Sequence, residues 1–230
     1  GAAGSCPPKG LPPRVKNSTE FLIDKNGKVT GETLVDCYSS SVNCSLKIML
    51  IRRTLLERFL HESRTSGRDD FESILPRNIS LLNVHAYEQK GFVRVLESLR
   101  SYYDISLELL KSENRKALFT PDRPVFTKVR DQIPAIYGIG ADVSNSLIAD
   151  GCRIDGTRKS HFLIPSILLR GVTVAKGAVV RNSIVMQSSY IGEGAKVESV
   201  ITDKSVVVKS GRTLCGAPTF PVYIGKGIVI

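Results

Sequence analysis

Two patterns of apolar and polar residues divide this chain of 230 residues. Up to about residue 118 the pattern alternates between strand-like and helix-like segments, whereas from about residue 139 one segment type recurs. Two β-prone runs flank Asn26-Gly27 and predict a hairpin over residues 20–31. In residues 45–63 a strand-like apolar start is followed by apolar positions at helical spacing. The first half is therefore expected to be a mixed α/β region.

The next two segments predict a helix and a strand. Residues 69–76 predict a short helix that Pro76 ends. Residues 79–88 alternate as a strand does, which places Leu82, Val84 and Ala86 on one face and His85 on the other. His85 is therefore interpreted as a solvated strand residue.

A second helix is expected after residue 94, with one apolar stripe along its length. The residues of this stripe are Leu96, Leu99, Tyr103, Leu107 and Leu110. The first half has too few strands for a complete doubly wound sheet, and neither GxGxxG nor GxxxxGK occurs in the chain. It is interpreted as the trailing part of an α/β domain.

The second half repeats a pattern of one serine, two apolar residues, a few small or polar residues and a further apolar residue. The four serines are separated by 20, 17 and 16 residues, and they are Ser146, Ser166, Ser183 and Ser199. These intervals bracket the ~18 residues of a coil made of three six-residue strands, which predicts a parallel β-helix. The β-prone end at 220–230 has only Lys226 as a charged residue, so we expect either a contact for self-association or a capped terminus.

Composition narrows the class of protein. No apolar run approaches the ~18 residues of a membrane span, and five scattered cysteines favour reduced thiols in the cytoplasm. The net charge of +10 suits a basic surface or an anion site, but the chain has no run of five basic residues, so nucleic acid is not expected as a partner. The opening GAAGS is interpreted as an expression remnant and the chain as a fragment.

Four stretches resemble the bacterial ADP-glucose pyrophosphorylase (glucose-1-phosphate adenylyltransferase) family. They are KNGKVTG (25–31), GFVRVLESLRSYYDISLELL (91–110), LFTPDRPVFTKVRDQIPAIYG (118–138) and GAVVRNSIVMQSSYIGEGAKVESVITDKSVVV (177–208). The resemblance implies a partial nucleotidyltransferase (Rossmann-like) α/β domain at 6–118, a linker at 119–138 and a left-handed parallel β-helix of hexapeptide repeats at 139–230.

Catalytic members of that family read approximately GYWxDVGT where this chain reads GFVRVLES. Aligned without gaps, their metal-binding aspartate falls on Val95, and their glycine and threonine fall on Glu97 and Ser98. Valine offers no oxygen ligand to Mg²⁺, which this reaction needs on the pyrophosphate leaving group. The lysine that catalytic members place on the sugar phosphate is also missing from GETLVDC (31–37), and so is their glycine-rich ATP loop.

The resemblance therefore implies the noncatalytic, regulatory type of subunit (GlgD type). Such a subunit is expected to assemble with a catalytic partner that makes ADP-glucose from ATP and glucose 1-phosphate for glycogen synthesis. No cofactor is expected in this chain, and Mg²⁺ is expected only on the partner. Self-association through the β-helix and binding of a phosphorylated metabolite are expected as well.

Three alternatives stay open at this stage. A fragment of a catalytic subunit would need another residue in place of the ligand lost at Val95. A hexapeptide acyltransferase would use a histidine as general base, for which His161 lies within the repeats. A bare scaffold would assemble with the catalytic subunit and bind no effector.

Three basic residues of the repeat region are the candidate effector site. Arg170, Lys176 and Arg181 lie close together in the sequence and could hold an anion. The alternative interpretation is that they are solvated residues on the coil surface.

Overall fold

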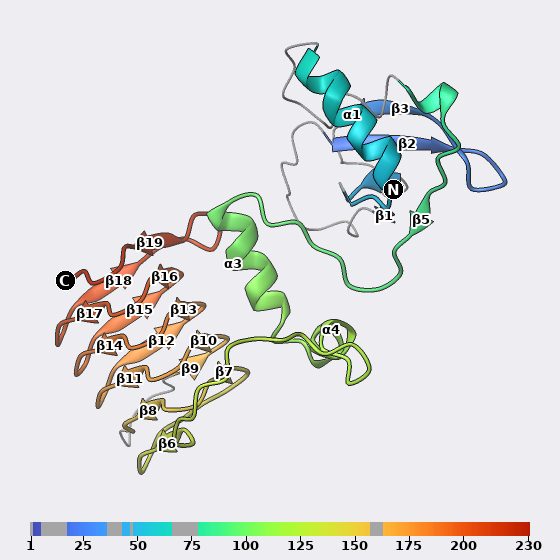
Figure 1. Cartoon of the computed structure of the whole chain (residues 1–230). Helices are drawn as coiled ribbons and strands as arrows, with labels where there is room; N and C mark the ends of the chain where they lie inside the picture. Colours follow the sequence, from blue (N-terminus) through green and yellow to red (C-terminus); the bar gives the residue numbers. More distant parts are fainter. Residues whose placement is uncertain (1, 6–17, 36–42, 47, 66–77, 157–162) are drawn as a thin grey trace. The chain divides into compact units, whose positions relative to one another are not determined.

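A computed structural model describes residues 2–5, 18–35, 43–46, 48–65, 78–156 and 163–230 of the chain (Figure 1). The chain divides into two compact units, Gly1–Val93 and Arg94–Ile230. The first unit is a mixed α/β region and the second is a parallel β-solenoid of short strands. Both halves of the predicted fold class are thereby confirmed.

The first unit contains a five-stranded sheet in the order β3-β2-β4-β1-β5. Its strands are β1 (Ala2–Ser5), β2 (Ser18–Ile23), β3 (Val29–Val35), β4 (Asn43–Ser45) and β5 (Tyr87–Glu88). Within the described residues only β1 and β5 pair in parallel, and the other pairs are antiparallel. Residues 2–5, which the sequence interpretation set aside, are thus one strand of this sheet.

The predicted hairpin is confirmed by the antiparallel pair β2 and β3. The Asp24 carboxylate accepts hydrogen bonds from the backbone N–H groups of Asn26 (2.8 Å) and Lys28 (2.9 Å), which fixes the turn. Gly27 has a φ of 80°, a left-handed conformation that glycine adopts without a Cβ penalty.

Helix α1 (Arg53–Thr65) confirms the helical part of the 45–63 prediction, and Phe59 is its fully buried side chain. The strand expected before this helix is wrong beyond Ser45, because residues 48–52 form no strand and Leu50 is fully exposed. The helix expected at 69–76 lies outside the described residues.

Residues 79–88 form a 3-10 turn, η2 (Ile79–Leu81), and then an irregular segment that ends in β5. A continuous strand is therefore wrong, but the two faces were assigned correctly. Leu82, Val84 and Ala86 pack against the core of this unit, which is formed by Phe21, Val29 and Ile79, and His85 is exposed.

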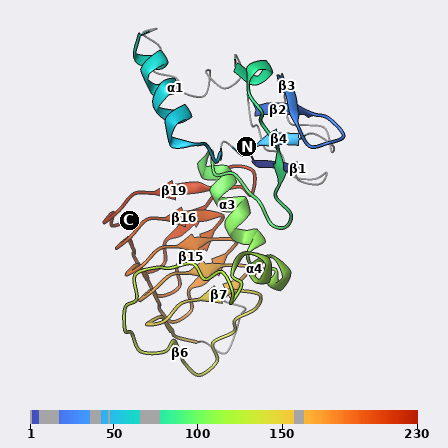
Figure 2. The same ribbon diagram turned by 45° about the vertical axis from the view of Figure 1, so that its right-hand side comes forward.

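The second unit is a solenoid of three parallel sheets, with the strands of each sheet one coil apart (Figures 1 and 2). The first sheet contains β7 (Leu147–Ile148), β10 (Ile167–Leu168), β13 (Ile184–Val185), β16 (Val200–Thr202) and β19 (Val222–Ile224). The second sheet contains β6 (Ile136–Tyr137), β8 (Arg153–Ile154), β11 (Thr173–Val174), β14 (Tyr190–Ile191) and β17 (Val207–Val208). The third sheet contains β9 (Leu163–Ile164), β12 (Val179–Arg181), β15 (Lys196–Glu198) and β18 (Thr213–Cys215).

Apolar residues fill the interior of the solenoid, since alternate residues along each strand point inward. Ile154, Val174, Val180, Ile191 and Val208 are fully buried there and belong to one cluster. Neighbouring coils stack these residues in register, for example Val174 beside Ile191. Burial of this continuous apolar row stabilises short strands that would not be stable alone.

The repeated serines form a ladder of hydrogen bonds at one corner of the solenoid. The backbone N–H of Ser166 donates to the Ser146 hydroxyl (3.2 Å), and the N–H of Ser183 donates to the Ser166 hydroxyl (3.3 Å). The Ser183 hydroxyl accepts from the backbone N–H of Val200 and not from that of Ser199. The reason is the strand register, since the pairing of Ile184 with Ile201 places Val200 beside Ser183. Ser199 instead takes the left-handed corner position of Asn182, with φ values of 52° and 45°. The fourth serine of the predicted repeat is therefore one residue out of register.

Helix α3 (Leu99–Glu108) covers the outer face of the first sheet (Figure 2). Tyr103 is buried there with the outward side chains of Ile167, Ile184 and Ile201. The Tyr103 hydroxyl donates to the carbonyl oxygen of Asn182 at 2.5 Å. Desolvation by burial raises the pKa of the Tyr103 phenol above its usual value.

The prediction of the apolar stripe along this helix needs correction. Leu96 precedes the helix, which begins after Ser98, Leu99 is exposed in its first turn, and the apolar stripe starts only at Tyr103. The compact unit that contains the solenoid begins at Arg94 and includes α3 and the following α4 (Ser112–Leu118), while the predicted domain bounds of 6–118, 119–138 and 139–230 stay a prediction.

Candidate functional site

The candidate site is the segment that leads into α3, where the sequence predicted a missing metal ligand. Val95 lies in a stretch without helix or strand, and 52% of its surface is exposed. Its side chain is an alkyl group and cannot ligate a metal ion.

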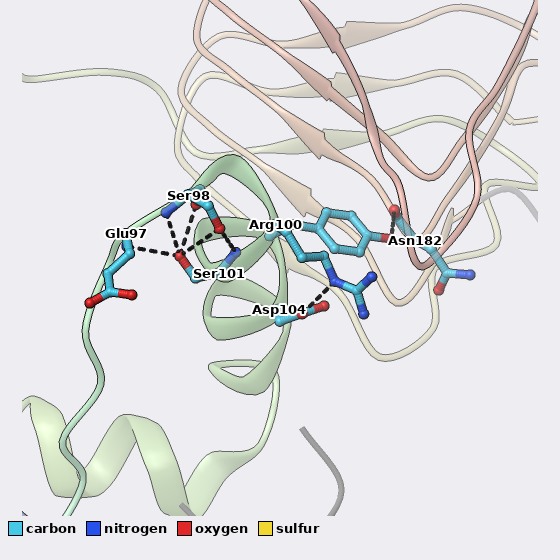
Figure 3. Close-up of polar contacts among 7 residues, drawn as sticks. Glu97, Ser98, Arg100, Ser101, Asp104 and Asn182 are labelled. Atoms are coloured by element: carbon cyan, nitrogen blue, oxygen red, sulfur yellow. Dashed lines mark hydrogen bonds and ion pairs between the residues drawn. The ribbon is translucent and has the colours of Figure 1, made fainter. Parts of the chain in front are cut away.

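The start of α3 is fixed by a reciprocal capping box (Figure 3). The Ser98 hydroxyl accepts from the backbone N–H of Ser101 at 3.0 Å, and the Ser101 hydroxyl accepts from the N–H of Ser98 at 2.8 Å. The N–H of Glu97 also donates to the Ser101 hydroxyl, at 2.9 Å. These bonds satisfy backbone donors that the first helical turn leaves open. Ser98, placed on the threonine of the family motif, thus serves as a helix cap.

Arginines already engage the two carboxylates of α3. Arg100 Nε lies 2.5 Å from Asp104 Oδ2, one helical turn along (Figure 3). Arg94 Nε lies 2.7 Å from Glu108 Oε2, and the exposed fractions of these side chains are only 22% and 13%. Asp104 and Glu108 are therefore held by cations, and the carboxylate of Glu97 is exposed.

The C-terminal end of α3 is tied down by the helix that follows it. Arg115 Nη1 donates to the carbonyl oxygens of Leu109 and Leu110, both at 2.6 Å, and Asn114 Nδ2 donates to that of Glu108 at 2.9 Å. Carbonyl oxygens at a helix end have no partner within the helix, so these side chains stabilise α3 in place. The segment after Val95 is thus a well-anchored element.

This arrangement does not fit a magnesium site. Within the described ranges no group of three or more His, Cys, Asp or Glu side chains could hold a metal ion. Mg²⁺ needs oxygen ligands in near-octahedral geometry, and the position beside the α3 cap offers valine. We therefore derive no catalytic step from this segment.

The three basic residues of the predicted effector site lie at three places along one coil. Arg170 lies between β10 and β11, Lys176 lies between β11 and β12, and Arg181 is the last residue of β12. Because these strands belong to three different sheets, the residues occupy successive corners of one coil. A shared anion site of these three side chains stays a prediction, and His161 lies outside the described residues.

The ion pair between Arg94 and Glu108 was missed by the sequence interpretation, since the residues are 14 positions apart and follow no motif. Replacing Arg94 with alanine is expected to destabilise the second unit by about 2 kcal/mol, because it leaves the largely buried Glu108 carboxylate without its cation. Urea unfolding of the chain would measure the change. The double variant Arg94→Ala with Glu108→Gln should recover most of the loss, and an unchanged midpoint for Arg94→Ala would contradict this role.

No helix found in the described ranges is long and apolar enough to cross a membrane. Cys152 and Cys215 are free thiols, the first buried and the second exposed. Burial raises the pKa of the Cys152 thiol, so that it remains protonated in the solenoid interior.

Comparison with known proteins gives concordant similarities for both halves. Residues 136–217 match the family model of the GlmU-like C-terminal hexapeptide. The chain is 34% identical to glycogen biosynthesis protein GlgD of Bacillus subtilis (strain 168), over 80% of this chain and 52% of that protein. It is 27% identical to glucose-1-phosphate adenylyltransferase of Fervidobacterium nodosum, over 70% of this chain and 37% of that protein. It is 24% identical to a glucose-1-phosphate adenylyltransferase of Clostridium perfringens (strain 13), over 77% of this chain and 50% of that protein. The chain thus spans about half the length, or less, of these relatives.

Proposed function

Because the chain is a GlgD-like member of the ADP-glucose pyrophosphorylase family, we propose that it belongs to a regulatory subunit that lacks catalytic activity of its own. This subunit assembles with a catalytic adenylyltransferase subunit and changes the affinity of that partner for substrate or effector. The reaction it modulates is the synthesis of ADP-glucose from ATP and glucose 1-phosphate. It contributes to glycogen synthesis in the cytoplasm.

The observation that supports this proposal is the environment of Val95. The family resemblance places a metal-binding aspartate here, and this chain has an exposed alkyl group in its place. Of the carboxylates near Val95, Glu108 and Asp104 are paired with Arg94 and Arg100. The exposed Glu97 is a single carboxylate, and within the described ranges no group of three or more His, Cys, Asp or Glu side chains could hold a metal ion. When Mg²⁺ is bound in a catalytic subunit, it neutralises charge on the pyrophosphate leaving group.

Regulation would then act through the packing of α3. The segment that carries Val95 joins the capped start of α3 at Ser98, and α3 lies on the first sheet of the solenoid through Tyr103. A partner that binds the solenoid differently in two states would shift this helix and the segment before it. A coupling free energy of about 1–3 kcal/mol is typical of such regulation and changes an apparent affinity by about 5–150-fold.

The test is pyrophosphorolysis of ADP-glucose by the complete natural protein, alone and mixed with its catalytic subunit. We expect no turnover by the protein alone and a change in the apparent affinity of the mixture for substrate. The control replaces this protein in the mixture with an equal concentration of serum albumin. Robust turnover by the protein alone would overturn the proposal, because another residue would then have to hold the metal.

One variant separates the loss of the metal-binding aspartate from the loss of the lysine that contacts the sugar phosphate. Val95→Asp restores a carboxylate but not the lysine missing from residues 31–37, so the variant alone is expected to stay inactive. Strong activity of Val95→Asp would show that valine was the single defect, and the protein would then be one substitution away from a catalytic subunit.

A further inference from the structure

A row of four side chains runs along the corner of the solenoid between the first and second sheets. Each of these residues lies two positions after the end of a strand of the first sheet, and the register of that sheet places them one coil apart. They are Arg170, Gln187, Lys204 and Lys226. The carbonyl oxygens of Arg170, Gln187 and Lys204 accept backbone N–H groups of the next coil at 2.9–3.0 Å. Because stacked coils are about 4.8 Å apart, the row extends over about 14 Å.

The three charged members of this row, which we call the corner row, are all cations. Within the described ranges no ion pair and no side-chain hydrogen bond engages Arg170, Lys204 or Lys226. Lys204 and Lys226 are exposed on adjacent coils, so their ammonium groups repel each other, whereas Arg170 is partly buried. The coil before Arg170 has Asp150 at this position, which ends the cationic part of the column. An anion placed along the corner row would relieve the repulsion between its cations.

Two other columns of charged residues on the solenoid carry mixed charges. At the corner between the second and third sheets, the N–H of Gly194 donates to the carbonyl oxygen of Lys176, which places Glu193 one coil from that lysine. On the third sheet Arg181 pairs with Glu198. An anion at either column would lie beside a carboxylate. The corner row is thus the better site for an extended anion.

Small polar residues beside the corner row leave it open and add hydrogen-bond donors. Ser188 and Ser205 follow the row on two successive coils, with left-handed φ values of 60° and 59°. Both side chains are exposed, and a serine hydroxyl can donate to a phosphate oxygen. The acidic neighbour of Lys204 is Asp203, whose two carboxylate oxygens accept from the Lys204 N–H at 2.6 Å and from the Tyr223 hydroxyl at 3.2 Å. This carboxylate is therefore already engaged in hydrogen bonds.

The shape of the corner row favours a thin, linear anion. A compact ion such as orthophosphate can meet only one or two of the cations, because Arg170 and Lys204 are two coils, or about 10 Å, apart. A linear polyphosphate has charged oxygens along its whole length, and both guanidinium and ammonium groups bind phosphate oxygens. A single-stranded nucleic acid would need aromatic side chains beside the row for its bases, and the two adjacent columns contain none. These columns are Leu169, Met186, Asp203 and Gly225 on one side and Gly171, Ser188, Ser205 and Gly227 on the other.

We propose that the corner row is a binding site for linear polyphosphate, held by the three cations with Gln187 between them. The row shares only Arg170 with the effector site that the sequence predicted, because Lys176 and Arg181 lie at other corners. All residues of the row belong to the solenoid, so binding at this site is independent of turnover and goes beyond the proposed function.

The test is fluorescence anisotropy of end-labelled long-chain polyphosphate, titrated with the 230-residue chain at low salt. Replacing one cation with glutamine should weaken binding about three-fold, as is typical of an exposed ion pair. The triple variant Arg170→Gln, Lys204→Gln, Lys226→Gln should weaken it about thirty-fold. Binding should also weaken as salt is raised, because the charges are exposed. Unlabelled orthophosphate, at the same concentration of phosphate groups, should compete poorly.

Two further variants separate the corner row from the general charge of the protein. Gln187→Lys completes the row and should tighten binding about three-fold, a gain that partial unfolding could not produce. Lys176→Gln is the matched control, because it removes an equal charge from an exposed corner of the coil that carries Arg170. Its affinity for polyphosphate should stay nearly unchanged. Circular dichroism of the triple variant would show whether the solenoid remains folded.

Three results would each overturn the proposal. They are no binding by the unaltered chain, equal losses in Lys176→Gln and Lys204→Gln, and no gain in Gln187→Lys. A single-stranded oligonucleotide that binds as tightly and loses affinity in the same variants would overturn it as well, because the row would then serve nucleic acid. The assay contains no catalytic subunit, so this inference and the proposed function fail separately.

Discussion

Replacing Ile184 with aspartate is expected to release α3 from the solenoid and destabilise the second unit by about 4 kcal/mol or more. Ile184 lies on the outer face of its sheet yet is fully buried, because Tyr103 of α3 covers it. A carboxylate at this position would lose its hydration and gain no cation, which is among the most destabilising changes a single residue can introduce.

Hydrogen exchange of the amides in 99–118 would measure the release. In the native chain these amides should exchange slowly, and in Ile184→Asp they should exchange at rates near those of an unfolded segment. If the aspartate variant aggregates, Ile184→Ala provides the alternative measurement. It leaves a cavity, should lower the free energy of unfolding by about 2–3 kcal/mol and should keep the solenoid folded.

The matched control is Tyr190→Asp. Tyr190 lies on the same coil at the outward position of the second sheet, where its side chain is exposed. A charge there should change the free energy of unfolding by about 1 kcal/mol or less. Equal effects at Ile184 and Tyr190 would mean that α3 does not cover the first sheet in solution.

The second large effect is expected at a corner of the solenoid, from Gly192→Ala. A Cβ at residue 192 would lie 2.5 Å from the backbone nitrogen of Ser210 and 2.7 Å from the carbonyl oxygen of Val208. These atoms belong to the next coil, and their spacing is fixed by the hydrogen bond from the N–H of Gly192 to Val208 at 2.8 Å. The coils would have to separate, so we expect the free energy of unfolding to fall by about 3 kcal/mol.

Gly194→Ala, two residues along the same corner, distinguishes crowding from backbone conformation. Gly194 has a φ of 66°, but a Cβ there would meet no atom within 4 Å. Its replacement should therefore cost about 1 kcal/mol, the strain of a left-handed alanine. Thermal unfolding of both variants would show the difference, and equal losses would contradict the close approach of the coils at Gly192.

The repeats were predictable because their apolar positions recur at a nearly regular interval. Coils that stack on one another bury apolar residues spaced in this way. The hydrophobic face of 82–86 was predictable for a similar reason, since alternation determines a buried face even where hydrogen bonding is irregular. The start of α3 was missed because its apolar residues continue across Ser98, and only the capping box sets the boundary.

What could not be predicted depends on contacts between distant residues. The packing of Tyr103 on Ile184 assigns α3 to the solenoid, but the helical spacing of its stripe does not say which partner it meets. In the same way, Arg170 and Lys176 are close in sequence but lie at different corners. In a coil of this kind the neighbours in space are about 17 residues apart, as the pairing of Thr173 with Tyr190 shows.

The exposed position of Val95 has a consequence for the history of such a subunit. Because this side chain is half in water and outside any helix or strand, exchanging aspartate for valine alters the folding free energy by only a few tenths of a kcal/mol. On the proposed function, chemistry could thus be lost by a single substitution while the protein kept its fold. A duplicated copy of a catalytic subunit could then persist on its binding role alone, with selection acting on its surfaces and no longer on its turnover.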